Sequence, residues 1–391
     1  MQKIIFTVTS DLNTDQRMQR ICSSLHTHGF DILLVGRHLV TDNLEFPFPH
    51  KRIKCWFNSG ILFYTEYNIR LFIFLLFAKM DVLCSIDLDT LLSGRIASLL
   101  RNKKQIYDAH EYFTESPELD DRPVVKKIWE GIARITIPYV HSGYTVNNSI
   151  ADFLSDRYGK ELSVIRNFPE IKTDTSAEVK AKLSSITSLE KTDVYHGLQS
   201  ANSNQKQQDL YLLYQGVLNK GRGLEALIKS FHQIPDIPLW IAGDGDIKKE
   251  LEELALRESL SDRIKFLGKL APAKLKEVTK NATVGYNLLD PSNKNYYFSL
   301  ANKYFDYMMA GVPSISMNFP EYALIHEDIP FSVLIDTLSI DAIVEATLTL
   351  LNNEDRYKKI QANCFLARQK YNWQMEEKQL LEFYKNLSFK Q

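Results

Sequence analysis

Short apolar runs that alternate with helical patterns are the feature that most limits how this chain can fold. The runs are four to six residues long and lie at 3–8, 31–35, 82–86, 105–108, 143–146, 162–165, 210–214, 239–242, 264–267, 284–288 and 314–317. Most are followed by a turn and a helical stretch, an order that is typical of parallel sheets covered by helices. We therefore predict an α/β fold, with functional groups at the C-terminal ends of the strands.

A polar segment separates these runs into two sets. Residues 173–208 are rich in Ser, Thr, Lys, Asn and Gln, and we predict that they form a linker or a variable surface excursion. Because 391 residues exceed the usual size of one compact domain, two domains with a cleft between them are expected. We place them at 1–172 and 209–370, and each is predicted to be a doubly wound, Rossmann-like sheet.

Charge, hydropathy and cysteine usage argue against several classes of protein. A dedicated nucleic-acid binder would usually be strongly basic, whereas the net charge here is −1. Residues 3–8 lack the features of a signal peptide, and the most apolar run, 71–78, is far shorter than the roughly 20 residues that span a bilayer. The four cysteines form no Cys-x-x-Cys pair, so zinc is not expected. We expect a cytoplasmic protein without a membrane-spanning helix.

Aromatic residues crowd the segment from 56 to 77. They are Trp56, Phe57, Phe63, Tyr64, Tyr67, Phe72, Phe74 and Phe77. Aromatic residues at helical spacing usually pack inward, so most of these are expected in the core. The alternative is a surface that contacts a membrane peripherally.

The segment 299–322 reads as a helix, a tight stop and a buried strand. Asn302 is predicted to cap a helix over 303–309, and Gly311 to end that helix in the left-handed conformation. Asp306 is an acid on an otherwise apolar helix. Near the helix N-terminus its carboxylate could accept both hydroxyls of a ribose while free N–H groups receive a diphosphate. Alternatively, Asp306 is a solvated acid on the outer face.

Three other places carry candidate chemistry. His110 and Glu111 follow the strand at 105–108, where open sheets place functional groups. Asp87-Leu88-Asp89 follows the strand at 82–86. Such a pair of acids can hold a metal-bound diphosphate, but here Asp89 and Thr90 are better placed to cap the next helix and line the cleft. In the loop 215–223, Gly216 and the basic residues Lys220 and Arg222 could bind an anion, or the loop could simply be flexible.

Several of these segments resemble family-4 retaining glycosyltransferases of bacteria, which have the GT-B fold. The similar segments are Asn302-Lys303, Phe305-Asp306-Tyr307-Met308, Ala310-Gly311-Val312-Pro313, Phe319-Pro320-Glu321, Asp108-Ala109-His110-Glu111-Tyr112-Phe113, Asp15-Gln16-Arg17, Asp87-Leu88-Asp89 and Tyr371-Asn372-Trp373. The last of these implies a final helix, 371–391, that returns to the first domain. The resemblance covers nearly the whole chain but does not identify a substrate.

The resemblance implies a role for each candidate residue. Asp306 would bind the ribose of the donor, and His110 would face the transferred sugar. Arg222, or alternatively Lys220, would neutralise the diphosphate as the second catalytic group. Further donor contacts are implied at Gly216, Gly243, Asn302 and Lys303, and acceptor-side positions at Asp15, Arg17, Asp87, Asp89 and Glu111. Phe298 stands where the family has an acid that contacts the donor sugar, so this chain must hold the sugar ring differently.

The implied activity is transfer of a sugar from a nucleotide-diphosphate donor to a saccharide or lipid-linked acceptor. It would proceed with retention of configuration and without a metal or other cofactor, in surface polysaccharide synthesis. The protein would be cytoplasmic, with possible peripheral contact at the inner face of the membrane. Two alternatives stay open. One is a sugar-nucleotide epimerase of the same fold, and the other is a catalytically silent partner of another transferase, which the missing acid at Phe298 would suit.

Overall fold

The chain is divided into two compact units. The structure is a computed structural model that describes residues 2–39, 45–171 and 210–387, so the predicted linker at 173–208 lies outside the described residues. The first unit comprises Met1–Asn167 and Glu376–Gln391, and the second comprises Phe168–Met375. The division therefore falls a few residues from the predicted boundaries. Phe168 belongs to the second unit because its ring centre lies 4.7 Å from that of Phe305 and 5.6 Å from that of Tyr371.

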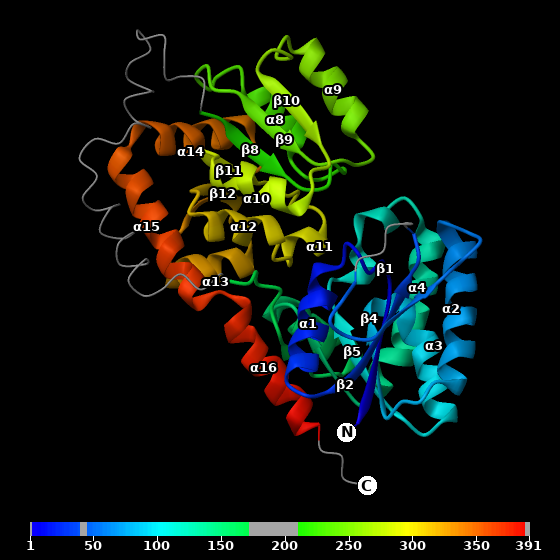
Figure 1. Cartoon of the computed structure of the whole chain (residues 1–391). Helices are drawn as coiled ribbons and strands as arrows, with labels where there is room; N and C mark the ends of the chain where they lie inside the picture. The colour runs from blue at the N-terminus through cyan, green and yellow to red at the C-terminus, as the bar shows by residue number, and fades with distance from the viewer. Residues whose placement is uncertain (1, 40–44, 172–209, 388–391) are drawn as a thin grey trace. The chain divides into compact units, whose positions relative to one another are not determined.

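The first unit contains a seven-stranded parallel sheet in the order β3-β2-β1-β4-β5-β6-β7. Its elements are β1 (Lys3–Asp11), α1 (Gln16–Thr27), β2 (Asp31–Arg37), β3 (His50–Ile53), α2 (Gly60–Phe77), β4 (Val82–Ile86), α3 (Asp87–Leu100), β5 (Lys104–Ala109), α4 (Pro123–Thr136), β6 (Ser142–Thr145), α5 (Asn148–Tyr158), β7 (Ser163–Val164) and short 3-10 turns at Phe113–Glu115, Pro117–Leu119 and Ile137–Tyr139. Figure 1 shows α2, α3 and α4 along one face of the sheet and α1 on the other.

The last helix, α16 (Trp373–Asn386), completes the first unit. The ring of Tyr384 lies 5.9 Å from that of Phe6, and its hydroxyl is 3.2 Å from the hydroxyl of Tyr144. In the first turn of α16, Glu376 Oε2 accepts a hydrogen bond from the backbone N–H of Arg166 at 2.7 Å. Aromatic packing from the far end of the chain therefore closes the core beneath β1 and β6.

The second unit contains a six-stranded parallel sheet in the order β10-β9-β8-β11-β12-β13. Its elements are β8 (Leu212–Gln215), α8 (Leu224–Ser230), β9 (Leu239–Ala242), α9 (Lys248–Arg257), β10 (Ile264–Gly268), α10 (Pro272–Lys280), β11 (Val284–Asn287), α11 (Lys294–Tyr297), α12 (Asn302–Ala310), β12 (Ser314–Met317), α13 (Pro320–Asp328), β13 (Ser332–Ile335), α14 (Ile340–Asn352) and α15 (Glu354–Lys370). Two parallel, helix-covered sheets confirm the predicted α/β fold.

The predicted helix, stop and strand near residue 310 are present as α12, Gly311 and β12. Gly311 has φ +73°, the left-handed conformation that glycine adopts without strain. The prediction that Asn302 caps α12 is wrong. Ala301 occupies the N-cap, and its N–H is already bound by the hydroxyl of Tyr322 at 2.8 Å, so Asn302 becomes the first residue of the helix.

Helix α2 is apolar on both of its faces. Phe63, Tyr67, Leu71 and Leu75 recur at every fourth position and are buried against the sheet, and the hydroxyl of Tyr67 donates to the carbonyl of Val8 at 2.6 Å. By length and composition alone α2 could cross a membrane, and only 22% of it is buried. The predicted aromatic core is thus present only on one face. Phe77, the last residue of the helix, and Trp56, which precedes the helix, are each 83% exposed.

Candidate functional site

Each sheet has one point at which the strand order reverses, and the candidate residues gather there. In the first unit this point lies between β1 and β4, and in the second between β8 and β11. The loops that follow these strands diverge and leave a crevice at the C-terminal edge of a doubly wound sheet, which is where such folds bind ligands. The two units therefore each present one candidate site.

In the first unit, a buried ion pair positions His110. Arg17 donates to Asp108 Oδ1 at 3.0 Å, and both side chains are almost wholly buried. The other oxygen of Asp108 lies 3.0 Å from Nε2 of His110, whose Nδ1 is 3.5 Å from Asp87 Oδ2. Residues that are 91 positions apart in the sequence thus form a continuous polar chain at the ends of β4 and β5.

Asp87 has an unfavourable backbone conformation. Its φ is +53°, in the left-handed region where a residue with a side chain is strained by roughly 1–2 kcal/mol. The conformation is held because Asp87 Oδ1 accepts a hydrogen bond from the backbone N–H of His110 at 2.8 Å. Strain of this kind, at the end of a central strand, is common in ligand-binding sites.

The charges in this cluster shift one another's ionisation. Burial opposes ionisation of Asp108, but the charges of Arg17 and His110 outweigh it and lower the pKa of the carboxyl. Burial alone would lower the pKa of His110, yet Asp108 and Asp87 raise it to about 9. Burial also raises the pKa of Asp87. At neutral pH the imidazole of His110 is therefore a cation between two carboxyl groups.

Asp89 does not cap α3, contrary to the prediction. The helix begins at Asp87 with no side-chain cap, and Asp89 Oδ2 instead accepts a hydrogen bond from the hydroxyl of Thr9 on β1. Asp89 is 8% exposed, and within the described residues its Oδ1 has no hydrogen-bond partner. Burial is the main cause that raises the pKa of Asp89 to about 7.

This raised pKa predicts how Asp89 affects stability. A carboxyl whose pKa rises from 3.8 to about 7 on folding favours the folded state only while it is protonated. Stability should therefore fall as the pH rises from about 4 to 7, and Asp89→Asn should remove that part of the decrease. Urea unfolding at pH 4, 6 and 8 measures this pH dependence of the free energy of unfolding. Asp152 is an exposed acid of the same unit, and Asp152→Asn is the matched control. Parallel pH curves for the wild type and Asp89→Asn would contradict this prediction.

In the second unit, Asp306 is held by the end of β8. Asp306 is half-buried on α12, and its Oδ2 accepts a hydrogen bond from the side-chain amide of Gln215 at 2.9 Å. The side-chain oxygen Oε1 of Gln215 in turn accepts a hydrogen bond from the hydroxyl of Thr279 at 2.6 Å. The carboxylate is thus oriented by two buried residues, which argues against a freely solvated acid.

Lys303 has a buried side-chain amine that has no polar partner within the part of the chain that the structure describes. It is 7% exposed, and within the described residues its Nζ makes no hydrogen bond. Nζ lies 4.0 Å from the centre of the Tyr214 ring, and Gly216 is so close that a Cβ there would approach it to 3.3 Å. Burial and the nearby Arg222 lower the pKa of Lys303 well below its usual range, while Asp306 raises it. An anion at the end of β8 would supply the missing partner.

Gly216 and Gly243 allow the chain segments that follow β8 and β9 to approach each other closely. A Cβ on Gly243 would lie 1.8 Å from the carbonyl oxygen of Gly216, so only glycine fits there. Of the two basic candidates in the loop, Arg222 lies half-buried with its guanidinium 4.5 Å from the ring centre of Tyr296. Lys220 is exposed. Arg222, but not Lys220, lies close enough to Lys303 to lower its pKa.

The remaining predicted residues have other surroundings. Asp15 caps α1 by accepting a hydrogen bond from the N–H of Met18 at 3.0 Å. Glu111 is half-buried and lines a groove together with Asp89, whereas Asn302 is exposed at the start of α12. Phe298 ends α11 with its ring against that of Tyr297.

The residues that orient the side chains of Asp89 and Asp306 were not predicted from the sequence. Thr9, Gln215 and Thr279 have no motif of their own. Thr9 and Gln215 do lie at the ends of β1 and β8, beside the two reversal points, and that position is the one signal that could have identified them.

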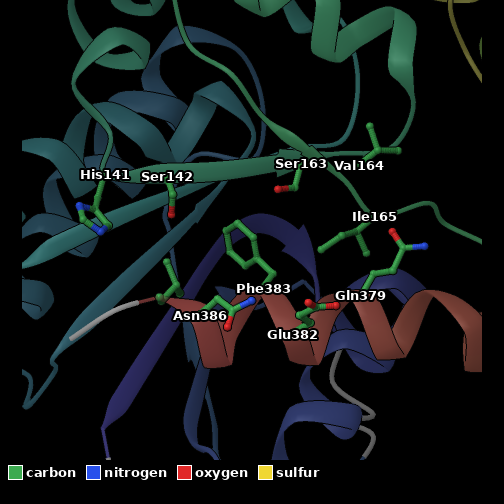
Figure 2. Close-up of a pocket in the computed structure, with 10 residues that line it drawn as sticks. His141, Ser142, Ser163, Val164, Ile165, Gln379, Glu382, Phe383 and Asn386 are labelled. Atoms are coloured by element: carbon green, nitrogen blue, oxygen red, sulfur yellow. The ribbon is translucent and has the colours of Figure 1, made fainter. Parts of the chain in front are cut away.

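A cavity in the first unit contains no predicted site residue. Its volume is about 700 Å³, and Figure 2 shows its lining from β6, β7 and α16, including His141, Glu382 and Phe383. His141 precedes β6 and so lies at the N-terminal edge of the sheet, opposite the edge that carries His110. This cavity is separate from the candidate site.

Known proteins share the fold of this chain. The model of the family described as glycosyl transferases group 1 matches residues 198–365. A comparison with curated proteins finds no match. Among solved structures, HepE of Anabaena in complex with UDP and glucose is 14% identical, covers 99% of this chain and 100% of its own, and superposes with a TM-score of 0.71.

Two further structures are similar over nearly the whole chain. Sucrose-phosphate synthase from Thermosynechococcus elongatus is 14% identical and covers 99% of both chains, with a TM-score of 0.76. WaaG, a glycosyltransferase involved in lipopolysaccharide biosynthesis, is 13% identical and covers 96% of this chain and 98% of its own, with a TM-score of 0.69. The fold is that of the GT-B glycosyltransferases, as the resemblance to family 4 implied, and residues 198–365 match the model of the group 1 glycosyl transferases.

Proposed function

We propose that this chain transfers a sugar, with retention of configuration, from a nucleotide-diphosphate donor to a hydroxyl of a saccharide or lipid-linked acceptor. The second unit binds the donor and the first binds the acceptor. The bond between the anomeric carbon and the diphosphate oxygen breaks, and a bond to the acceptor oxygen forms on the same face of the sugar. The proton of the acceptor hydroxyl leaves with the diphosphate.

The observation that carries this proposal is the buried amine of Lys303, which has no hydrogen-bond partner among the described residues. A buried ammonium costs free energy unless it is paired, so its place beside Gly216 is best explained by an anionic ligand. Negative charge develops on the diphosphate as it leaves, and Lys303 with Arg222 would stabilise it electrostatically. Asp306, oriented by Gln215, would accept the ribose hydroxyls.

On the acceptor side, His110 is the central group. Its charge is fixed by Asp108 and Asp87, and its side chain is 20% exposed at the end of β5, where a bound sugar could contact it. Asp89, whose Oδ1 has no partner within the described residues, would accept a hydrogen bond from an acceptor hydroxyl. Both groups would thus hold the reacting hydroxyl.

Peripheral membrane contact fits the outer face of α2. Ile61, Ile69, Ile73 and Phe77 lie on one stripe of this helix at intervals of four or eight residues, and all are exposed. An apolar stripe of this length on a surface helix is suited to lie in a membrane interface. We propose that the protein works in the cytoplasm at the inner face of the membrane, in the synthesis of a surface glycan.

A panel of nucleoside diphosphates and their sugars tests the proposed donor. UDP and UDP-glucose come first, because structures of HepE contain UDP and UDP-glucose. A ligand at about 100 times its dissociation constant should stabilise the protein by roughly 2.7 kcal/mol in a thermal-shift assay. Product analysis with the donor alone then separates the alternatives. An epimer would indicate an epimerase, and binding without turnover on any acceptor would indicate a silent partner.

Asp306→Ala is expected to weaken binding of the stabilising nucleotide by about 1–3 kcal/mol, because a charged hydrogen bond to the ribose is lost. Isothermal titration calorimetry measures the change. Glu345→Ala, an exposed acid on α14, is the control and should bind as the wild type does. Equal affinity in Asp306→Ala and the wild type would remove Asp306 from the donor site.

Transfer is expected to continue in excess chelator, since Lys303 and Arg222 supply positive charge at the diphosphate. Asp87 and Asp89 already bond to His110 and Thr9. A manganese-dependent glycosyltransferase assayed in parallel is the control for effective chelation. If chelation abolished transfer, manganese restored it, and Asp87→Ala and Asp89→Ala were both inactive, the diphosphate would have to be metal-bound.

A further inference from the structure

An apolar groove runs along the first unit between α2, α3 and α4. Its volume is about 720 Å³, within the range of small-molecule sites. The wall on α2 includes Ile61 and Ile69, the wall on α3 includes Ile96, and the wall on α4 includes Ile128 and Trp129. Of these five side chains only Trp129 is buried. The groove therefore offers an extended apolar surface to a ligand.

One part of the groove is polar. Asp89 and Glu111 line it beside the candidate acceptor site, and Asp89 Oδ1 is a buried oxygen with no hydrogen-bond partner within the described residues. A buried carboxyl oxygen without a donor costs free energy, so a hydroxyl of a ligand would be favourable there. The groove thus combines a long apolar wall with a hydrogen-bond acceptor next to His110.

We infer that this groove binds the hydrocarbon chain of a lipid-linked acceptor and places its hydroxyl-bearing end at Asp89. This inference rests on the proposed function and narrows it, because a free saccharide would leave the apolar walls in water. Ile61 and Ile69 belong both to the groove and to the exposed stripe of α2. A chain could therefore enter the groove from a lipid surface without crossing bulk water.

Alkyl glucosides provide a probe that needs neither donor nor turnover. Hexyl, octyl and decyl β-glucoside share one head group, and each is titrated below the concentration at which it forms micelles. If the chain lies in the groove, the dissociation constant should fall about two- to fourfold for each added methylene. Equal affinity across the three compounds would overturn the inference.

Two isoleucines on α2 give a matched pair of variants. Ile69 lines the groove and is 54% exposed, whereas Ile73 lies one turn further along, outside the groove, and is 52% exposed. Ile69→Lys should weaken decyl glucoside binding at least tenfold and remove the dependence on chain length. Ile73→Lys should retain both. Ile128→Lys, on the opposite wall, should repeat the effect of Ile69→Lys if that variant fails to fold.

Sedimentation with phosphatidylglycerol vesicles separates chain binding from simple membrane contact. If Ile69→Lys and Ile73→Lys weakened decyl glucoside and vesicle binding equally, α2 would be only a membrane-contacting surface and the inference would be wrong. Nucleotide binding by the second unit is measured on the same variants and should be unchanged. A wild-type protein that binds decyl glucoside but shows no response to any nucleotide would instead count against the proposed function.

Discussion

Replacing Lys303 with methionine is expected to make the free protein more stable while lowering turnover by a factor of about 10²–10³. Methionine fills a similar volume, and the variant no longer buries an ammonium without a hydrogen-bond partner, so the free energy of unfolding should rise by roughly 1–3 kcal/mol. Turnover falls because the charge that stabilises the departing diphosphate is lost. Chemical denaturation and steady-state kinetics measure the two effects.

Lys229→Met is the control for this substitution. Lys229 is an exposed lysine in the last turn of α8, and its replacement removes the same charge from the same unit. It should change neither stability nor turnover appreciably. A Lys303→Met protein that is less stable than the wild type but fully active would show that Lys303 supports the fold and does not act on the donor.

Replacing Arg17 with methionine should destabilise the protein by about 3–5 kcal/mol, because it leaves the buried carboxylate of Asp108 without its main counter-charge. Folding lowers the pKa of Asp108 from 3.8, so this residue contributes stability that is present above that pH and is lost as the pH falls further. The difference between the wild type and Arg17→Met should therefore be largest at neutral pH and shrink in acid. Urea unfolding at pH 3.5 and 7 measures it.

Arg134→Met is the matched control, since Arg134 is an exposed arginine of α4 in the same unit. Because Arg17 also lowers the pKa of His110, nuclear magnetic resonance should show that this pKa rises in Arg17→Met if the variant stays folded. An unfolding free energy within 1 kcal/mol of the wild type at neutral pH would mean that the ion pair adds little to the fold.

The fold could be predicted largely because its central strands are buried on both faces. A run such as residues 82–86 is apolar enough to be recognised without any partner. Of the four edge strands, β7 and β10 were predicted, but β3 and β13 were not. β3 has the sequence His-Lys-Arg-Ile and buries only Ile53, and β13 follows a proline and was not predicted at all. At an edge, pairing with the neighbouring strand replaces burial as the stabilising contact, and sequence does not show that pairing.

The positions of the candidate site residues could be predicted, but most of their partners could not. His110 and Asp306 stand out because polar residues follow or interrupt apolar elements. The bond of Arg17 to Asp108 and that of Gln215 to Asp306 join residues 91 positions apart, and no local pattern records such a pairing. For Asp89 a role was predicted, and it was wrong. Its spacing fitted a helix cap, but the strand order brings Thr9 to it first.

The way in which α16 completes the first unit has a consequence for biosynthesis. About 200 residues of the second unit are translated between the two parts of the first, which takes roughly 10–40 s at about 5–20 residues per second. Until Tyr384 emerges from the ribosome, Phe6 and Tyr144 lack the aromatic side chain that covers them. During that interval the nascent first unit lacks the helix that covers these aromatic residues, and exposed apolar surface of this kind favours aggregation.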